Sequence, residues 1–144
     1  MHKQDRERLL KHLDFLKEEL KDFPKFRKLD RKNYIEKRDD RRNVERWVEN
    51  LVNCSIDIGK IVLAAKKRPI PETYREVLFN LGSLPDFPES LGEELSRWTK
   101  LRNILAHDYL DIRWNNIKAF IDEAEPVFKK FVSKVETLLK SNLS

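Results

Sequence analysis

The sequence predicts an all-α protein, a five-helix up-and-down bundle in a single domain that spans residues 1–144. Charged residues make up 38% of the chain and glycine occurs only 3 times, a composition that favours helices. Runs of β-branched residues are short, which disfavours strands. Apolar residues recur three and four positions apart, the spacing that lines one face of a helix. A chain of 144 residues is long enough to bury a core.

The first expected helix covers residues 5–21. Four leucines repeat there at spacings of four, three and four: Leu9, Leu13, Leu16 and Leu20. Phe23 and Pro24 should end this helix, because proline cannot continue the hydrogen-bond ladder and restricts the residue before it.

The second expected helix is the longest. It should begin between Asp30 and Asp40 and end near Lys67, with an apolar stripe wide enough to contact two neighbouring helices. Cys54 lies in this stripe, so we expect it to be buried. As the single cysteine of the chain, it excludes an internal disulfide and a cysteine-based zinc site.

Three further helices are expected in the second half of the chain. A short one over residues 73–81 should be closed by Gly82, which tolerates a left-handed cap. The fourth should cover residues 89–108. The fifth should start at an Asp111 N-cap and be kinked, rather than divided, at Pro126.

The net charge of +5 is unevenly spread. Residues 1–69 carry 20 lysines and arginines against 13 acids, whereas residues 70–144 carry 10 against 12. The densest basic stretch, residues 25–46, could track a phosphate backbone or form a solvated helix face with interleaved acids. The sequence leaves both interpretations open.

Two features of the sequence indicate where the protein is located. The chain is charged from Lys3 onward, so no signal peptide is visible, and no apolar run approaches the length of a membrane span. We therefore expect a cytoplasmic protein that does not contact a membrane. Neither a metal cluster nor a cofactor motif is evident, so we expect no metal and no cofactor.

Residues 102–109, which read RNILAHDY, carry most of the chemical information. They place an arginine, an amide, a histidine and a tyrosine within two helical turns. An arginine and a histidine together can stabilise a phosphate and move a proton without metal, as metal-independent RNA cleavage requires. The candidate residues are Arg102, Asn103, His107, Asp108 and Tyr109.

Helical geometry constrains how these side chains meet. Arg102 falls inside the apolar stripe of its helix. Either a carboxylate from another helix meets its guanidinium, with Asp57 as the first candidate, or the edge of the stripe opens onto a cleft or a second subunit. Asn103 and His107 share a face turned by about 140° from Arg102 on a regular helix. Either the helix loosens before His107, or two subunits combine their residues across a two-fold axis.

The pattern Arg-x4-His-x-Tyr at Arg102, His107 and Tyr109 resembles the signature of HepT-like toxins, within the HEPN superfamily of small helical proteins. The segments 73–78 and 82–85 look like the region that precedes the signature helix in this family. The resemblance covers most of the chain and is most specific between residues 44 and 112.

The resemblance implies an all-α homodimer whose paired signature helices form an RNA-cleaving groove. On that basis Arg102 holds the scissile phosphate, His107 acts as general base or acid, and Asn103 orients the phosphate or the histidine. From their positions in the sequence, and not from the resemblance, Asp57 and Asp108 are the expected supporting acids. The resemblance calls for no metal.

The same resemblance implies regulation by a partner. In similar proteins the motif tyrosine, here Tyr109, accepts AMP from a nucleotidyltransferase antitoxin of the MNT type, in a type VII toxin–antitoxin system. Two other functions stay open. One is a non-catalytic HEPN adaptor that binds nucleotides or RNA through Arg102 and Asn103. The other is a helical module that only pairs subunits.

Overall fold

The computed structural model describes residues 1–141, and these residues are helical without any strand. The all-α prediction is confirmed. No helix in this part of the chain is long and apolar enough to cross a membrane. The elements are α1 (Lys3–Leu20), α2 (Phe23–Arg27), α3 (Arg31–Glu36), α4 (Arg38–Ala65), α5 (Tyr74–Leu81), α6 (Glu89–Arg97), the 3-10 turn η1 (Trp98–Lys100), α7 (Leu101–His107), α8 (Leu110–Glu123) and α9 (Glu125–Ser141).

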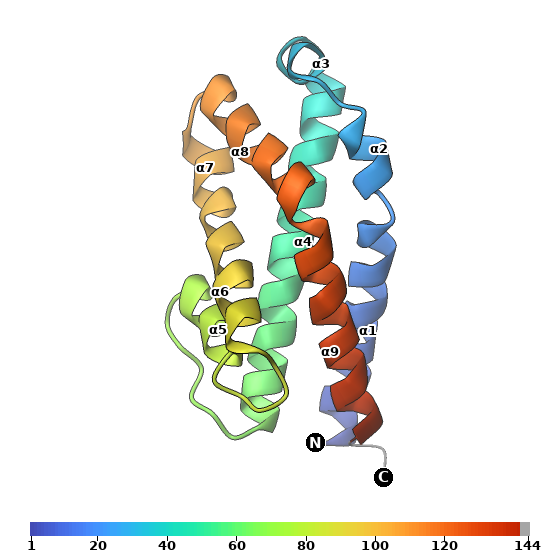
Figure 1. The fold of residues 1–144 in the computed structure, drawn as a ribbon, viewed down its shortest axis with the longest axis vertical. Coiled ribbons are helices and arrows are strands. Elements are labelled where there is room, and N and C mark those ends of the chain that lie inside the picture. The colour runs from blue at the N-terminus through green and yellow to red at the C-terminus, as the bar shows by residue number, and fades with distance from the viewer. Residues whose placement is uncertain (142–144) are drawn as a thin grey trace.

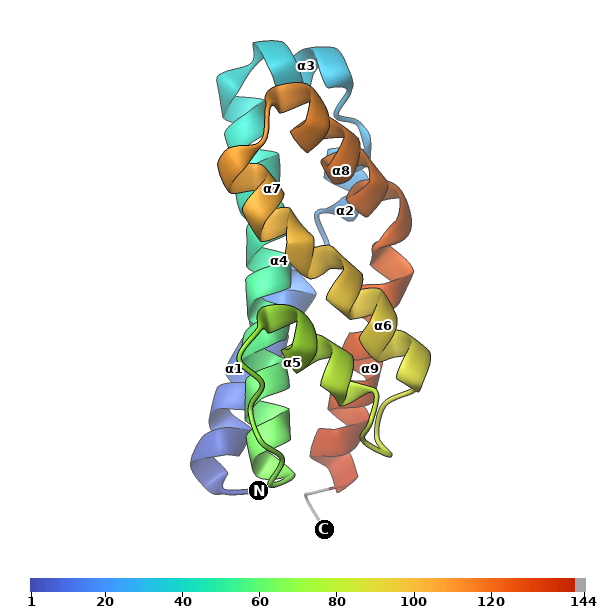
Figure 2. The same ribbon diagram turned by 90° about the vertical axis from the view of Figure 1, so that its left-hand side faces the viewer.

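The long helices form an elongated bundle (Figure 1). Helices α1, α4 and α9 run along its long axis, with α4 in the middle, while α5, α6 and α7 lie together on one side. Figure 2 shows that α6, η1 and α7 follow one another along a line that crosses α4 obliquely. Because α4 packs against α1, α5, α7 and α8, its wide apolar stripe is buried on several sides, as the sequence predicts.

Aromatic rings fill the centre of the bundle around Phe120 of α8, which is fully buried. Its ring centroid lies 5.9 Å from that of Phe23, 5.6 Å from Trp47, 5.3 Å from Trp98 and 5.6 Å from Phe128. These rings come from α2, α4, η1 and α9, so one side chain joins five elements of the bundle.

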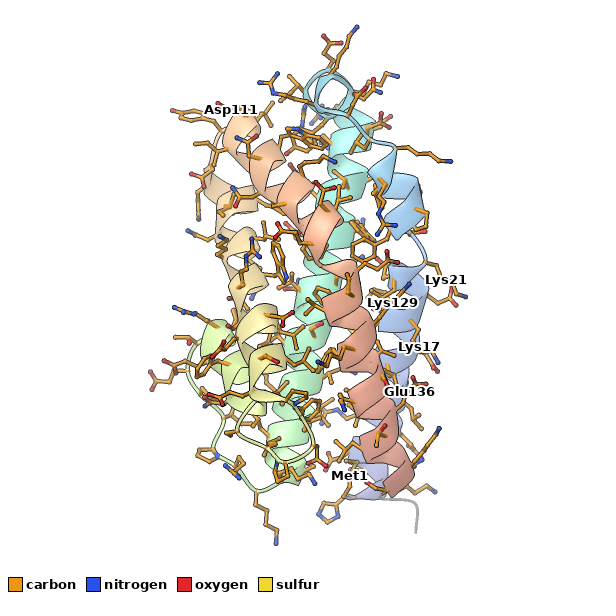
Figure 3. All side chains as sticks on the ribbon, in the orientation of Figure 1. Met1, Lys17, Lys21, Asp111, Lys129 and Glu136 are labelled. Atoms are coloured by element: carbon orange, nitrogen blue, oxygen red, sulfur yellow. The ribbon has the colours of Figure 1, made fainter. Side chains whose placement is uncertain are left out.

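Polar contacts tie the outer helices to this core. The Tyr34 hydroxyl of α3 and the Arg113 guanidinium of α8 both donate hydrogen bonds to the carboxylate of Glu45 on α4. Burial, together with the neighbouring Glu45 carboxylate, raises the pKa of Tyr34 above its usual range. Lys17 of α1 and Glu136 of α9 face each other at 3.2 Å between Nζ and Oε2 (Figure 3).

The N-terminal half agrees with its predicted helices and adds two. Helices α1 and α4 match the expected ranges, but Pro24 also starts the short α2, at a first-turn position where its missing N–H is harmless. Helix α3 was not predicted, although its N-cap is present in the sequence: the Asp30 carboxylate accepts from the backbone N–H of Asn33 at 2.8 Å.

The left-handed cap predicted at Gly82 is wrong. Gly82 has φ −66°, and the backbone continues in right-handed turns. A glycine is needed there for space, since a Cβ would lie 2.9 Å from the carbonyl oxygen of Glu89. Among residues 1–141 the left-handed backbone conformation is found at Lys67, with φ 57°, just after α4.

A second glycine allows α5 and α6 to touch. A Cβ on Gly92 would lie 2.6 Å from the Phe79 carbonyl oxygen and 2.9 Å from the Gly82 nitrogen, closer than side chains tolerate. The backbones of the two helices therefore meet directly at Gly92.

The last two predicted helices are each divided. The fourth is interrupted by η1, where i to i+3 geometry replaces the α-helical ladder. The fifth begins at Leu110 with Tyr109 as N-cap, so the Asp111 N-cap is wrong; Asp111 instead lies in the first turn, at the outer end of α8 (Figure 3). This predicted helix is also two helices and not one kinked helix: α8 ends at Glu123 and α9 begins at Glu125. The division lies next to Pro126, which lacks the N–H that a continuous helix would need.

Candidate functional site

All three predicted catalytic side chains line one surface pocket, of about 420 Å³. Arg102, Asn103 and His107 all come from α7, which forms one wall. Helix α4 forms the opposite wall, and α5 and η1 contribute the rest. The full lining is Glu49, Asn53, Tyr74, Thr99, Arg102, Asn103, Ala106 and His107.

Helix α7 presents these residues because its other face is anchored. Leu101 and Leu105 are buried in the core, which directs the remaining rows of the helix toward the pocket and solvent. Of the two alternatives for bringing these side chains together, loosening of the helix before His107 is not found, since α7 is regular and ends at His107. The pocket instead extends over both rows of side chains.

Arg102 is half-buried, and its partner is an aromatic ring. The guanidinium carbon lies 4.2 Å from the ring centroid of Tyr74. Lys60 approaches the same ring, at 5.1 Å. Hydrogen bonding and charge from Arg102, with a smaller contribution from Lys60, lower the pKa of the Tyr74 phenol. Because a ring holds the guanidinium without neutralising it, the positive charge of Arg102 stays available for an anion.

The expected pairing of Asp57 with Arg102 is corrected. Asp57 instead lies next to His12, at 3.7 Å between Oδ2 and Nε2, because α1 packs along α4 and brings His12 to this carboxylate. Within residues 1–141 no ion pair includes Arg102. If Asp57 supports the site, it does not do so through an ion pair with Arg102.

Asp108 and Tyr109 lie at the edge of the site, where α7 ends and α8 begins. Both have extended backbone conformations, and both side chains are exposed. Tyr109 is 83% exposed, an unusually open position for an aromatic side chain. An enzyme that modifies a phenol could reach it without unfolding the bundle.

Four pocket residues were missed by the sequence analysis: Glu49, Asn53, Tyr74 and Thr99. Glu49 and Asn53 are four apart on α4 and so share a face, which is the only signal the sequence offers for them. The Asn53 Oδ1 atom is buried and has no hydrogen-bond partner among the described residues. This amide oxygen is an acceptor that a ligand hydroxyl could satisfy.

The basic stretch 25–46 is partly engaged within the molecule. Arg27 pairs with Glu125, and this contact is the main reason that the pKa of Glu125 lies below its usual value. Arg41 donates to the backbone carbonyls of Tyr34 and Ile35 at 3.2 and 2.9 Å. These two arginines hold helices together, and a role for the stretch in RNA binding stays a prediction.

The cysteine and the potential metal ligands of the chain are considered next to the pocket. Cys54 is buried as predicted, and burial raises the pKa of its thiol to about 12, so it is not a nucleophile at neutral pH. Within residues 1–141 no group of three or more histidine, cysteine or acidic side chains is arranged to hold a metal ion.

Solved structures with the same fold include toxins in toxin–antitoxin complexes. One is a toxin–antitoxin complex with AMP-PNP, which superposes with a TM-score of 0.78 at 16% identity and covers 90% of this chain and 97% of that one. Another is a tri-AMPylated HEPN toxin of Shewanella oneidensis in complex with an MNT antitoxin, with a TM-score of 0.77 at 17% identity over 90% and 96% of the two chains. At these identities the likeness shows the fold.

Sequence comparison is more specific. A curated protein of Aphanizomenon flos-aquae (strain 2012/KM1/D3), the tRNA nuclease HepT, is 25% identical over 129 residues, which cover 90% of this chain and 83% of that protein. The family model described as "Ribonuclease HepT-like" matches residues 16–135, including the whole of the pocket. The chain therefore belongs to the HepT-like ribonuclease family.

Proposed function

We propose that this protein is a metal-independent endoribonuclease toxin, with an active site formed by two copies of the chain. The observation that carries the proposal is the shared pocket of Arg102, Asn103 and His107. The name of the curated relative, a tRNA nuclease, supports RNA as the substrate. The toxin–antitoxin complexes of the same fold support a role as a toxin.

The chemistry assigns one task to each side chain. His107 removes the proton of a ribose 2′-hydroxyl, whose oxygen attacks the adjacent phosphorus. Arg102 stabilises the extra negative charge of the pentacoordinate state, and Asn103 orients the phosphate. The bond from phosphorus to the 5′-oxygen then breaks, that oxygen takes up a proton, and the products are a 2′,3′-cyclic phosphate and a 5′-hydroxyl.

A dimer would supply the two proton-transferring groups that this reaction needs. One histidine cannot remove a proton from the 2′-hydroxyl and protonate the leaving oxygen at the same moment. Two α7 helices paired across a two-fold axis would supply a second His107, one as base and one as acid. The exposed pocket face of α7 is available for such pairing.

The proposal predicts cleavage in the absence of free metal. Purified protein, shown by intact mass to be unmodified, should cut labelled transfer RNA and total RNA in EDTA and leave cyclic phosphate ends. Loss of cleavage in EDTA would contradict metal independence. Tight, salt-sensitive binding of RNA that stays intact would favour the non-catalytic adaptor instead.

We further propose that a nucleotidyltransferase antitoxin of the MNT type silences the toxin by AMP transfer to Tyr109. The Tyr109 oxygen would attack the α-phosphorus of ATP, losing its proton while pyrophosphate leaves. The added phosphate would stand two residues from His107, where its charge and bulk oppose entry of an RNA phosphate. The 83% exposure of Tyr109 supports this assignment.

Intact mass measures this modification directly. Incubation with the cognate nucleotidyltransferase and ATP should increase the mass by one or more AMP units and abolish RNA cleavage. Tyr109→Phe should remain unmodified at this position and stay active. Tyr74→Phe is the matched control, since Tyr74 is a second exposed tyrosine of the same pocket region. An undiminished increment on Tyr109→Phe would overturn the assignment.

A further inference from the structure

A second pocket, of about 530 Å³, adjoins the candidate site. Tyr74 and Thr99 line both pockets, so the two recesses lie next to each other with these side chains between them. The second one lies between α5 on one side and α6 with η1 on the other. Its lining is Tyr74, Arg75, Glu93, Ser96, Arg97, Thr99 and Lys100.

The charge of this second pocket is positive, with three cations against one acid. Arg97 is already engaged, because it pairs with Glu123 at 3.2 Å and lies 4.4 Å from the ring centroid of Trp98. Arg75 and Lys100 are exposed, and no ion pair within residues 1–141 includes them. Two cations therefore face the recess without an acidic partner.

Tertiary packing brings these two cations to one recess from separate helices. Arg75 is in the first turn of α5, and Lys100 ends η1. The backbone contact at Gly92 holds α5 against α6, which sets the distance between the two walls. The hydroxyls of Ser96 and Thr99 donate to backbone carbonyls, at 2.8 and 2.7 Å, so neither hydroxyl hydrogen is free to bind an anion, and Arg75 and Lys100 are the cationic donors without an ion pair within residues 1–141.

We propose that this second pocket is a subsite for the RNA backbone, in which Arg75 and Lys100 bind a phosphate next to the one that is cleaved. The inference rests on the proposed function, because the adjoining pocket is taken as the site of cleavage. A polynucleotide carries a phosphate at every residue, so a strand lying across Tyr74 must place further phosphates along the groove. Arg75 and Lys100, which form no ion pair within residues 1–141, are the side chains that can bind such a phosphate.

The test compares a long substrate with a short one. Arg75→Gln/Lys100→Gln should raise KM for a single-stranded oligoribonucleotide by roughly tenfold and leave kcat unchanged, since two phosphate contacts are lost. The dependence of log affinity on log salt should become shallower by about 1.4. Cleavage of a dinucleoside monophosphate, which has no second phosphate to bind, should be as in the wild type.

The control removes equal charge elsewhere. Lys21 and Lys129 line a cationic pocket of about 410 Å³ on the α1 and α9 side of the bundle, away from α7 (Figures 1 and 3). Lys21→Gln/Lys129→Gln should keep the KM and salt dependence of the wild type. Three outcomes would overturn the subsite. The control variant could show the same rise in KM as Arg75→Gln/Lys100→Gln, or the latter could keep the wild-type KM for the oligonucleotide. The third is that Arg75→Gln/Lys100→Gln loses activity equally on the oligonucleotide and on the dinucleoside monophosphate.

Binding measured alongside separates this inference from the proposed function. If the wild type cleaves neither substrate, the nuclease proposal fails. Fluorescence anisotropy with the same labelled oligonucleotide then still decides the subsite. A weaker and less salt-sensitive complex in Arg75→Gln/Lys100→Gln alone supports it, and an unchanged complex rejects it.

Discussion

Replacing His107 by alanine is expected to slow RNA cleavage by about 10² to 10⁴-fold, mainly through kcat. The imidazole is the pocket group suited to move protons near neutral pH, whereas substrate affinity should come from the cationic side chains. Steady-state kinetics on labelled transfer RNA measure both constants. The change should leave the fold intact, because His107 is exposed at the end of α7.

His12→Ala is the matched control for this variant. It also removes a partly exposed histidine, but from the contact with Asp57 between α1 and α4. It should cleave RNA at the wild-type rate. If His107→Ala were as active as His12→Ala, the histidine of the signature would have no part in the chemistry, and the adaptor function would gain.

Truncation of Phe120 to alanine should lower the free energy of unfolding by about 3 to 5 kcal/mol. The ring is fully buried and contacts aromatic side chains from four other elements, so the cavity left behind cannot close without moving several helices. Urea unfolding followed by circular dichroism gives the difference.

Phe15→Ala supplies the comparison, because Phe15 is a phenylalanine on α1 that is 45% exposed. Its loss should change the free energy of unfolding by no more than about 0.5 kcal/mol. A cost below about 1 kcal/mol for Phe120→Ala would mean that the aromatic cluster is not the centre of the core.

The helices that could be predicted are those with long apolar stripes. Helices α1 and α4 lie where their apolar stripes place them, and α5 lies within the short segment 73–81 that was expected before Gly82. Helices α2 and α3 are too short to show a helical repeat of apolar residues. The Asp30 N-cap is the one local signal for α3. No pattern in the sequence marks the break at η1. The break before α9 coincides with Pro126, but a proline can either kink or divide a helix, so its presence alone does not decide between the two.

The candidate site divides in the same way. Arg102, Asn103 and His107 stand close together in the chain, so a motif could find them. Tyr74 could not be found, because only the packing of α5 against α4 and α6 brings its ring over the guanidinium. The same reason explains the error at Asp57: the sequence gives its position on α4 but not the neighbour, His12, that α1 supplies.

The missing side chain at Gly92 has a consequence for the shape of the substrate. Since α5 and α6 meet backbone to backbone there, the spacing of the two helices that carry the walls of the second pocket is fixed. Duplex RNA keeps its phosphates on a stiff A-form frame, whereas an unpaired strand can bend each phosphodiester to fit. On the proposed function, a contact between two helices would thus confine cleavage to loops and other unpaired regions of a folded RNA.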